Sequence, residues 1–443
     1  MFDLIIREVN IVRPEGIFVG DVGVIGEIFA KIEGAIYDSG RVEIRGNGLY
    51  LLPGMIDSHV HLRTPGLNHK EDVFSGTQAA ITSGVTAVLD MPNTAPPTID
   101  REMLKNKRTF FAKNAQCDFG FFLGATNGNL EEILRMEQAK ENFAGIKVFM
   151  GSSTGDMYVA DDTVLSAFFH LTRKVIAVHA EDHLSLLLAG SRLKNIDDVA
   201  RHGDFRPREG VIAACEKAIA LAVEWDHRVH ICHVSTLEEA GVIEKKKGEA
   251  RLTCEVSPVH LAFNESHYRK FGNYLKVNPP VRGEEDSAWL WKALSSGVID
   301  MIATDHAPHL SEEKWLPYKQ APAGSPGLDT ALPFLLKSAM EGRITLESVS
   351  SLYAWKPALA FAIKNKGRID EGFDADMVIV DLNESRKWEK SDLKTKCGWS
   401  LFEGEVLPVK PREVYLRGHL KSRDGELFDT EAKGAELVFG EYV

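Results

Sequence analysis

The sequence predicts an α/β protein, a closed (β/α)8 TIM barrel with a small composite β-sandwich domain built from the two chain ends. The chain has 443 residues, enough for one barrel of roughly 250 residues and a smaller unit. Its composition, 44% hydrophobic and 26% charged, is typical of an ordered globular protein with a sizeable core. Between residues 53 and 365, apolar runs alternate with amphipathic stretches, which indicates βα units around a parallel sheet.

Eight apolar runs are predicted to be the barrel strands, and a plausible helix follows each of them. The segment 208–225 has apolar residues at helical spacing. A second helix is predicted in the segment 236–246, with Ser235 or Thr236 as its N-cap. Eight βα units over about 300 residues predict a closed barrel. The runs cover residues 56–62, 85–92, 117–125, 144–150, 175–182, 228–235, 252–261 and 299–308.

The two ends of the chain have β character instead. Residues 1–52 consist of short β segments separated by glycine, and β patterns return at 374–382 and 412–422. We therefore expect residues 1–52 and 366–443 to form one composite β domain, and residues 53–365 to form the barrel.

Charge and composition exclude several classes of protein. The 64 acidic and 52 basic residues give a net charge of −12, and acidic residues flank the longest basic cluster, at 245–247. We therefore expect neither nucleic acid nor an anionic membrane as a partner. The chain has no 18-residue apolar run and no signal-peptide pattern, which predicts a cytoplasmic protein. The five scattered cysteines are expected to be reduced core thiols, and no nucleotide-binding glycine motif occurs.

Histidines near the ends of predicted strands suggest a metal centre. His59 and His61 are two residues apart, so their side chains point to the same side of the first strand. His179, His233 and Asp305 stand near the carboxyl ends of the fifth, sixth and eighth strands. Each alone could be a hydrogen-bonded structural residue, but together at one barrel mouth they predict a site for zinc or another divalent metal that favours imidazole ligands. Because there are more than four ligands, we expect two metals; His230 is predicted to be structural.

Lys147 lies within an apolar run that both faces of the sheet should bury. It could extend from the strand end to solvent or pair with a carboxylate such as Asp305. Alternatively, a buried lysine with a lowered pKa reacts with CO₂, and the resulting carbamate bridges two cations. The histidines and Asp305 nearby favour the carbamate.

Several motifs carry a resemblance to a known family. They are His59-Val-His-Leu-Arg63 with the preceding segment 52–57, Met91-Pro-Asn-Thr94, His233-Val-Ser-Thr236, Thr304-Asp-His-Ala-Pro-His309, and the late segments 367–369 and 374–376. The chain resembles the dihydroorotase branch of the amidohydrolase superfamily along almost its whole length. The resemblance implies a barrel with a composite β domain.

The resemblance also implies the metal site and the substrate contacts. Two zinc ions would be held by His59, His61, His179, His233 and Asp305 and bridged by carboxylated Lys147. The chain has Gly151 where many similar enzymes carry a ligand aspartate, which favours the Lys147 carbamate. The expected substrate contacts are Arg63, Asn93, Asn278, His309, Ala323 and Gly324; among them the guanidinium of Arg63 suits a carboxylate.

The expected activity is the reversible hydrolysis of dihydroorotate to N-carbamoyl-L-aspartate in pyrimidine biosynthesis, by a homo-oligomer. The two metals would activate water, and Asp305 would carry the proton. A hydantoinase, dihydropyrimidinase or allantoinase is the alternative, because these enzymes share the Lys147-type site. A non-enzymatic, inactive scaffold subunit is a third hypothesis, although such a subunit would be expected to lose metal ligands.

Overall fold

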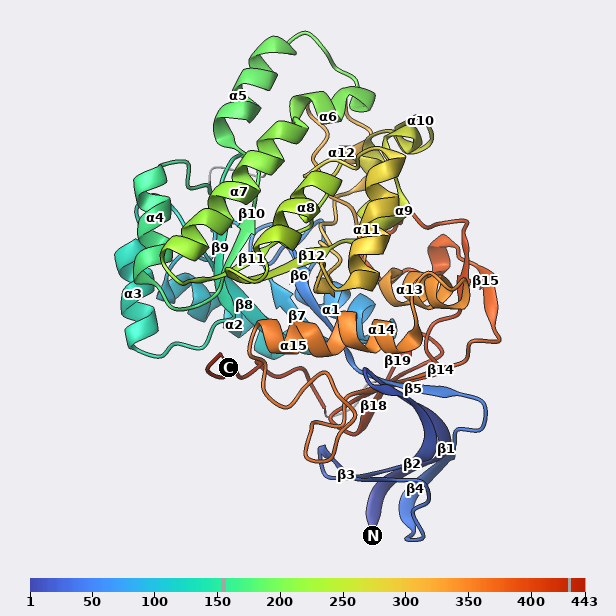
Figure 1. Cartoon of the computed structure of the whole chain (residues 1–443). Coiled ribbons are helices and arrows are strands. Elements are labelled where there is room, and N and C mark those ends of the chain that lie inside the picture. Colours follow the sequence, from blue (N-terminus) through green and yellow to red (C-terminus); the bar gives the residue numbers. More distant parts are fainter. Residues whose placement is uncertain (153–156, 429–431, 443) are drawn as a thin grey trace.

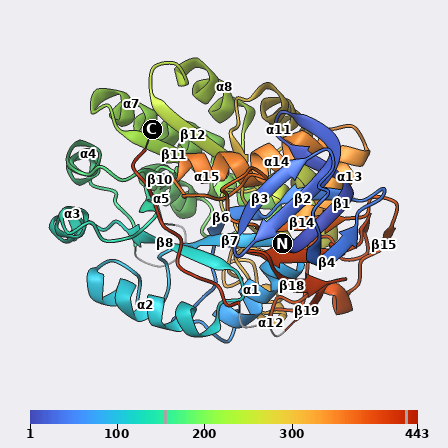
Figure 2. The same ribbon diagram turned by 90° about the horizontal axis from the view of Figure 1, so that it is seen from below.

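The computed structural model describes residues 1–152, 157–428 and 432–442. Helices surround a barrel of strands, and the strands from the start of the chain form a separate layer below it (Figure 1). A view from below brings this layer to the front (Figure 2).

Eight parallel strands form the barrel and follow one another in chain order. Nearly all of their residues are buried, because helices cover the outside and side chains fill the inside. The last link between the two edge strands is a single bridge from Val60 to His306. The predicted barrel is confirmed. Its strands are β6 (Met55–Val60), β7 (Val85–Asp90), β8 (Asp118–Gly124), β9 (Gly145–Phe149), β10 (Ile176–His179), β11 (Arg228–Ile231), β12 (Arg251–Val256) and β13 (Met301–Ile302).

Four of the eight helices that cover the barrel begin at a residue whose side chain accepts a hydrogen bond from the backbone of the first turn. Thr236, one of the two predicted N-caps, accepts a hydrogen bond from the backbone of Glu239, whose side chain accepts one in return from the Thr236 backbone. The covering helices are α1 (Val73–Thr82), α2 (Arg101–Asn114), α3 (Leu130–Gln138), α4 (Asp162–Leu171), α7 (Arg208–Glu224), α8 (Leu237–Lys246), α11 (Glu284–Ser296) and α13 (Ala331–Met340).

Strands from both chain ends form one mixed sheet with its own apolar core. Strand β5 pairs with β14, so that Leu52 lies opposite Val378. Buried Lys366 joins this layer to the barrel, because its ammonium group is 2.7 Å from Asp118 of β8 and 2.6 Å from Asp376. The strands are β1 (Phe2–Arg13), β2 (Gly16–Ile25), β3 (Ile28–Glu33), β4 (Gly40–Arg45), β5 (Tyr50–Pro53), β14 (Met377–Val380), β17 (Glu413–Leu416), β18 (His419–Arg423) and β19 (Glu426–Leu427).

The composite β layer is confirmed, whereas the exact limits of the two predicted domains stay a prediction. Residues beyond 366 also contact the barrel: Trp388 and Trp399 pack with Val259 and Val277 in one apolar cluster. The remaining elements of this part of the chain are β15 (Ser385–Lys387), η5 (Lys390–Asp392) and β16 (Val406–Pro408).

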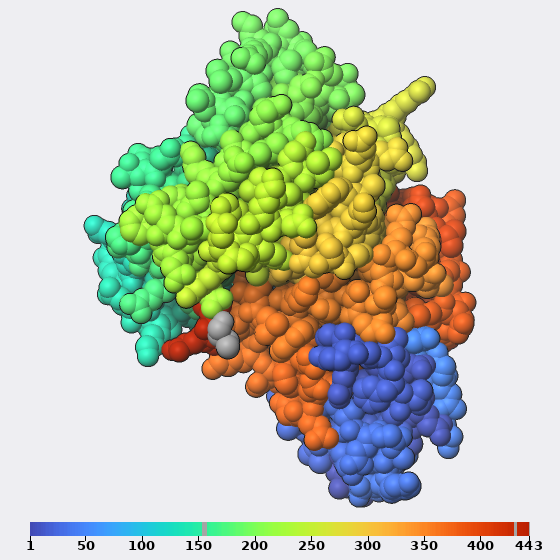
Figure 3. All heavy atoms as spheres, viewed as in Figure 1, coloured from blue at the N-terminus to red at the C-terminus, as the bar shows by residue number. Residues whose placement is uncertain are grey.

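Short helices complete the structure, some around the carboxyl ends of the strands and others on the side of the barrel that faces the β layer (Figure 1). Helices α5 (His183–Arg192), η1 (Val199–Arg201) and α6 (His202–Phe205) project above the barrel, as the green segment at the top of Figure 3 shows. The others are α9 (Pro258–Ala262), η2 (Glu265–His267), α10 (Tyr268–Phe271), η3 (Gly272–Leu275), α12 (Ser311–Lys314), α14 (Leu346–Ser350), η4 (Ser351–Trp355) and α15 (Lys356–Ala360).

Two further expectations concern cysteines and membranes. All five cysteines are free and buried, as predicted for core thiols. Among the residues that the structure describes, no helix combines the length and the apolar character needed to cross a membrane.

Candidate metal centre and substrate pocket

The predicted metal ligands converge at the carboxyl end of the barrel. His59 belongs to β6 and His61 follows it; Lys147 lies within β9, and His179 ends β10. His233 and Asp305 stand two and three residues beyond β11 and β13. Five strands thus direct side chains to one point, as expected for the mouth of a barrel.

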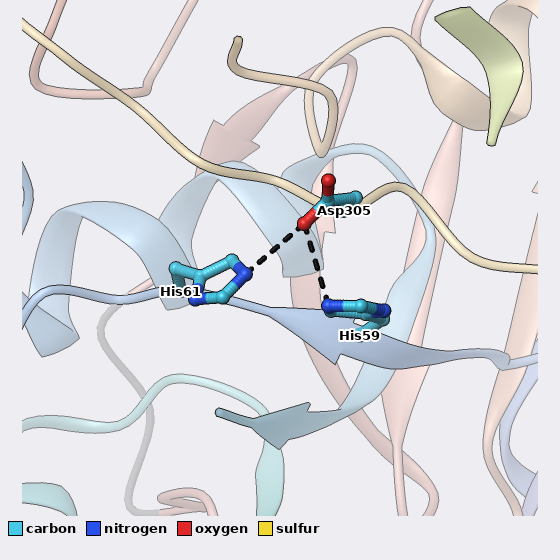
Figure 4. A group of neighbouring side chains, drawn as sticks. All are labelled: His59, His61 and Asp305. Atoms are coloured by element: carbon cyan, nitrogen blue, oxygen red, sulfur yellow. Dashed lines mark hydrogen bonds and ion pairs between the residues drawn. The ribbon is translucent and has the colours of Figure 1, made fainter. Parts of the chain in front are cut away.

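His59, His61 and Asp305 form the first group of candidate ligands (Figure 4). An Asp305 carboxylate oxygen is 3.0 Å from Nε2 of His61 and 3.4 Å from Nε2 of His59. These separations fit the edges of a tetrahedron around zinc, which are about 3.3 Å for bonds of about 2.0 Å.

The other nitrogen of each ring has its own acceptor. Nδ1 of His59 is 2.5 Å from a Glu255 oxygen, and Nδ1 of His61 is 2.6 Å from Oδ1 of Asn93. With the hydrogen on Nδ1, the Nε2 lone pair of each ring faces the Asp305 oxygen. Acceptors that face one another at this distance need a proton or a metal ion between them, so this donor set fits a metal ion.

His179 and His233 form the second group. Nδ1 of His179 is 2.9 Å from Nε2 of His233, and both rings are buried. Nε2 of His179 is 2.7 Å from Glu181, and Arg206 donates hydrogen bonds to the same carboxylate. Glu181 thereby holds the hydrogen on Nε2 and leaves the Nδ1 lone pair for a metal.

Lys147 is fully buried in the barrel. Its amine contacts the sulfur of Cys232 at 3.0 Å and lies 5.1 Å from the centre of the Phe149 ring. Within the described part of the chain, no carboxylate forms an ion pair with it, so the predicted alternative of a Lys147–Asp305 pair is not seen. Gly151 has no room for a ligand side chain, since a Cβ there would lie 2.5 Å from the Glu181 carbonyl oxygen.

Burial and neighbouring charges set the protonation of the ligands. Burial lowers the pKa of His61 to about 3, so this ring is neutral and able to bind a metal at pH 7. For His59, the Glu255 and Asp305 carboxylates outweigh burial and Lys147 and raise the pKa to about 10. A proton and a metal therefore compete for His59. Burial would raise the pKa of Asp305, but His59 and His61 hold it below its ordinary value.

The backbone at this site is strained at three positions. Arg63, His233 and Asp305 have φ angles of +58°, +35° and +48°, in the left-handed region that side chains disfavour. Such residues cost on the order of 1–3 kcal/mol each and cluster at functional sites. The predicted strand 299–308 is shorter than expected: only Met301–Ile302 form β13, and the turn at Asp305 follows three residues later.

Most predicted substrate contacts line the same small inner cavity of about 30 Å³ as the metal ligands. Arg63, Asn93, Asn278, Ala323 and Gly324 all border it. Gly324 has a φ of +134°, and a Cβ there would lie 2.5 Å from the Ala307 carbonyl oxygen, so the position requires glycine.

The remaining predicted contact, His309, borders an outer cavity of about 520 Å³. Arg63 and Asn93 border both cavities, so the two spaces adjoin. Arg63 is 4% exposed; its Nε donates to the Pro308 carbonyl at 3.1 Å, and its NH2 lies 3.1 Å from Nε2 of His309.

Sequence reasoning missed the two carboxylates that orient the histidines, Glu255 and Glu181. A signal was present, because each is an acidic residue within or beside an apolar strand run. His230, predicted to be structural, lies in the barrel interior and contacts Glu255 at 3.0 Å. It therefore supports His59 through Glu255.

Comparison with known proteins agrees with this architecture. A model of the amidohydrolase family matches residues 50–423. The chain belongs to the amidohydrolase family. It is 35% identical to a dihydroorotase of Methanosarcina acetivorans, over 93% of this chain and 89% of the relative, and 37% identical to one of Halobacterium salinarum, over 90% and 92%. Among solved structures, an L-hydantoinase from Arthrobacter aurescens superposes with a TM-score of 0.94 at 29% identity, covering 99% and 100% of the two chains.

Proposed function

We propose that this amidohydrolase is a dihydroorotase, which reversibly hydrolyses the cyclic amide of dihydroorotate to N-carbamoyl-L-aspartate. The archaeal dihydroorotases that match nearly the whole chain support this assignment. The observation that carries it is the buried guanidinium of Arg63, beside His309 and between the two cavities. A buried cation needs an anionic partner, and the substrate carboxylate supplies one.

The alternative cyclic amidohydrolases fit less well. Dihydrouracil and hydantoin have no carboxylate, so they would leave Arg63 without an anion in the pocket. The hydantoinase likeness, at 29% identity, is compatible with a shared barrel and metal site. An inactive scaffold is disfavoured because all six predicted metal ligands are present in the sequence.

The proposal includes two zinc ions held by the two histidine groups and Asp305, with carboxylated Lys147 as the bridge. When bound, the metals supply Lewis acidity and a water of lowered pKa. The facing acceptors of His59, His61 and Asp305 support this assignment, as does the buried amine of Lys147, which has no carboxylate partner among the described residues. Glu255, Asn93 and Glu181 keep the histidine rings oriented.

The residues of this chain then have distinct roles in the reaction. Arg63, Asn93 and His309 bind the carboxylate and orient the ring, while Asn278 and the backbone of Ala323 and Gly324 hold its far side. Asp305 accepts the proton that the attacking water loses and delivers it to the departing ring nitrogen. Ring opening therefore starts from ionised Asp305, and ring closure starts from the protonated form.

The proposed setting is cytoplasmic, with a small-molecule substrate and no nucleic acid or membrane partner, and the assembly is a homo-oligomer. Sedimentation of the purified protein tests the oligomer. The function is tested by measuring metal content and assaying dihydroorotate, dihydrouracil, hydantoin and allantoin side by side. Dihydroorotate should be the preferred substrate by a wide margin. Comparable activity on dihydrouracil would overturn the proposal in favour of a dihydropyrimidinase.

A further inference from the structure

An ion pair contacts Nδ1 of His309 at the wall of the outer cavity. Lys70, in the loop between β6 and α1, has its ammonium nitrogen 3.0 Å from Nδ1 of His309. The same nitrogen is 2.7 Å from a carboxylate oxygen of Glu313 in α12. Lys70 and Glu313 are only 12% and 26% exposed at their side chains, and His309 is 3% exposed. The cluster is therefore mostly buried, with Lys70 at the wall of the outer cavity.

This arrangement decides where His309 carries its hydrogen. An ammonium group has hydrogens to donate and no lone pair, so Nδ1 of His309 must be the acceptor. Burial, with the charge of Arg63, outweighs the effect of Glu313 and lowers the pKa of His309 to about 3, so the ring has a single N–H at pH 7. That hydrogen is on Nε2, which is 3.0 Å from the carbonyl oxygen of Ala323.

The consequence is that two donors meet: Nε2–H of His309, whose acceptor within the protein is the Ala323 carbonyl oxygen, and NH2 of Arg63. Nε2 of His309 and NH2 of Arg63 are 3.1 Å apart, and both carry hydrogen. An acceptor in front of them with two oxygens, such as a carboxylate, satisfies both donors at once. The outer cavity, which Arg63, Lys70 and His309 line, gives an anion access to this point.

We propose that Lys70 is a positioning residue for substrate binding: it holds His309 in the Nε2–H tautomer, so that His309 and Arg63 together donate to the substrate carboxylate. The inference rests on the proposed function and deepens it. Because Glu313 neutralises the charge of Lys70, Lys70 acts through its hydrogen bond rather than through added positive charge. Without Lys70, the hydrogen of His309 is free to move to Nδ1, 3.8 Å from Glu313, and the Nε2 lone pair then faces the carboxylate.

The first test reads the tautomer directly. Nitrogen-15 NMR of the histidine rings in the metal-loaded, substrate-free protein, with the His309 signals assigned by their loss in His309→Gln, should show hydrogen on Nε2. In Lys70→Met a large share of it should move to Nδ1, whereas Lys70→Arg, which can still donate to Nδ1, should keep it on Nε2. Hydrogen on Nδ1 in the unmodified protein, or an unchanged tautomer in Lys70→Met, would overturn the proposal.

The second test separates binding from turnover. Lys70→Met should raise the KM for dihydroorotate about 10- to 100-fold, the effect of losing a hydrogen bond to a charged group, with kcat within about 3-fold and metal content unchanged. Lys70→Arg should recover most of this loss. The matched control is Lys396→Met. Lys396 forms an ion pair with Asp72, in the same part of the chain as Lys70, but it lies outside the pocket.

The two tests also separate this inference from the proposed function. If the unmodified enzyme does not hydrolyse dihydroorotate, the proposed function fails, whereas the tautomer result still judges the role of Lys70. If dihydroorotate is the substrate but Lys70→Met leaves KM unchanged, the inference fails and the function stands.

Discussion

Replacing Glu255 tests whether the metal centre depends on a carboxylate that does not itself bind metal. One Glu255 oxygen is 2.5 Å from Nδ1 of His59, and the other is 3.0 Å from Nε2 of His230. The side chain is fully buried, and the charge of the two rings outweighs burial and holds the pKa of Glu255 well below its ordinary value. Removing such an outer partner typically weakens metal binding 10- to 100-fold, or about 1.4 to 2.7 kcal/mol.

The structure distinguishes two substitutions. In Glu255→Gln the amide oxygen can still accept from His59 while the amide NH₂ faces His230. His230 can adapt by changing tautomer, since its Nδ1 lies 2.9 Å from the Thr253 hydroxyl, which both donates and accepts. We expect about 10-fold weaker zinc binding in Glu255→Gln and about 100-fold in Glu255→Leu. Glu255→Leu should also lose about 1–3 kcal/mol of folding free energy for each ring N–H left without an acceptor.

Titration of metal-free protein with zinc against a chelating dye measures the first effect, and denaturant unfolding measures the second. Glu239→Gln is the matched control, because Glu239 is a buried carboxylate that caps α8 away from the site. It should lower stability and leave zinc affinity unchanged. Zinc affinity in Glu255→Leu equal to that of the unmodified protein would refute the reasoning.

Three more predictions concern the site, and a fourth concerns the pH dependence of stability. Lys147→Ala should lose metal and activity, and a short carboxylic acid should partly restore both; a fully active, fully metallated variant would contradict the carbamate bridge. Asp305→Asn should keep much of its metal, measured by elemental analysis, but lose nearly all turnover in both directions; substantial turnover would leave Asp305 as a ligand only. Arg63→Met should lower kcat/KM for dihydroorotate by at least about 100-fold at unchanged zinc content, because it deletes a buried charge-assisted contact; loss of metal instead would argue against the carboxylate role. Burial and Arg206 lower the pKa of Lys276 to about 8, below its value of about 10.4 in an unfolded chain. The folded state therefore binds fewer protons between these values, and the unfolding free energy should rise with pH in that window, an increment that Lys276→Met should abolish in denaturant titrations.

The barrel and the ligand-bearing strands were predictable because they depend on local patterns. Apolar runs of seven to ten residues contain, to within one residue, strands β6 to β12, which are four to seven residues long, since each run is buried on both faces. The two-residue spacing of His59 and His61 placed both rings on one side of β6 and its extension. Asp305 was predicted as a ligand although it lies beyond β13, because the carboxyl end of the strand already points to the barrel mouth.

The supporting residues were not predictable in the same way. Glu255 lies on β12 and His59 on β6, strands that stand near opposite ends of the strand order. The two side chains therefore come into contact only when the barrel closes. Lys70 reaches His309 across 239 positions of sequence, from a loop that carries no periodic pattern. His230 was assigned a structural role because strand alternation places it opposite His233, yet the chain leaves the extended conformation at His233, with a φ of +35°.

The sequence by itself determined which side chains are available for chemistry and which strand ends present them, because burial and periodicity act over a few neighbouring residues. Tertiary structure alone decided which nitrogen of each histidine is free. That choice depends on an acceptor or donor within about 3 Å of the other nitrogen, as Glu255 is for His59 and Lys70 is for His309. Hydrogen bonds of this length join residues hundreds of positions apart only after the barrel has closed, and no local pattern encodes them.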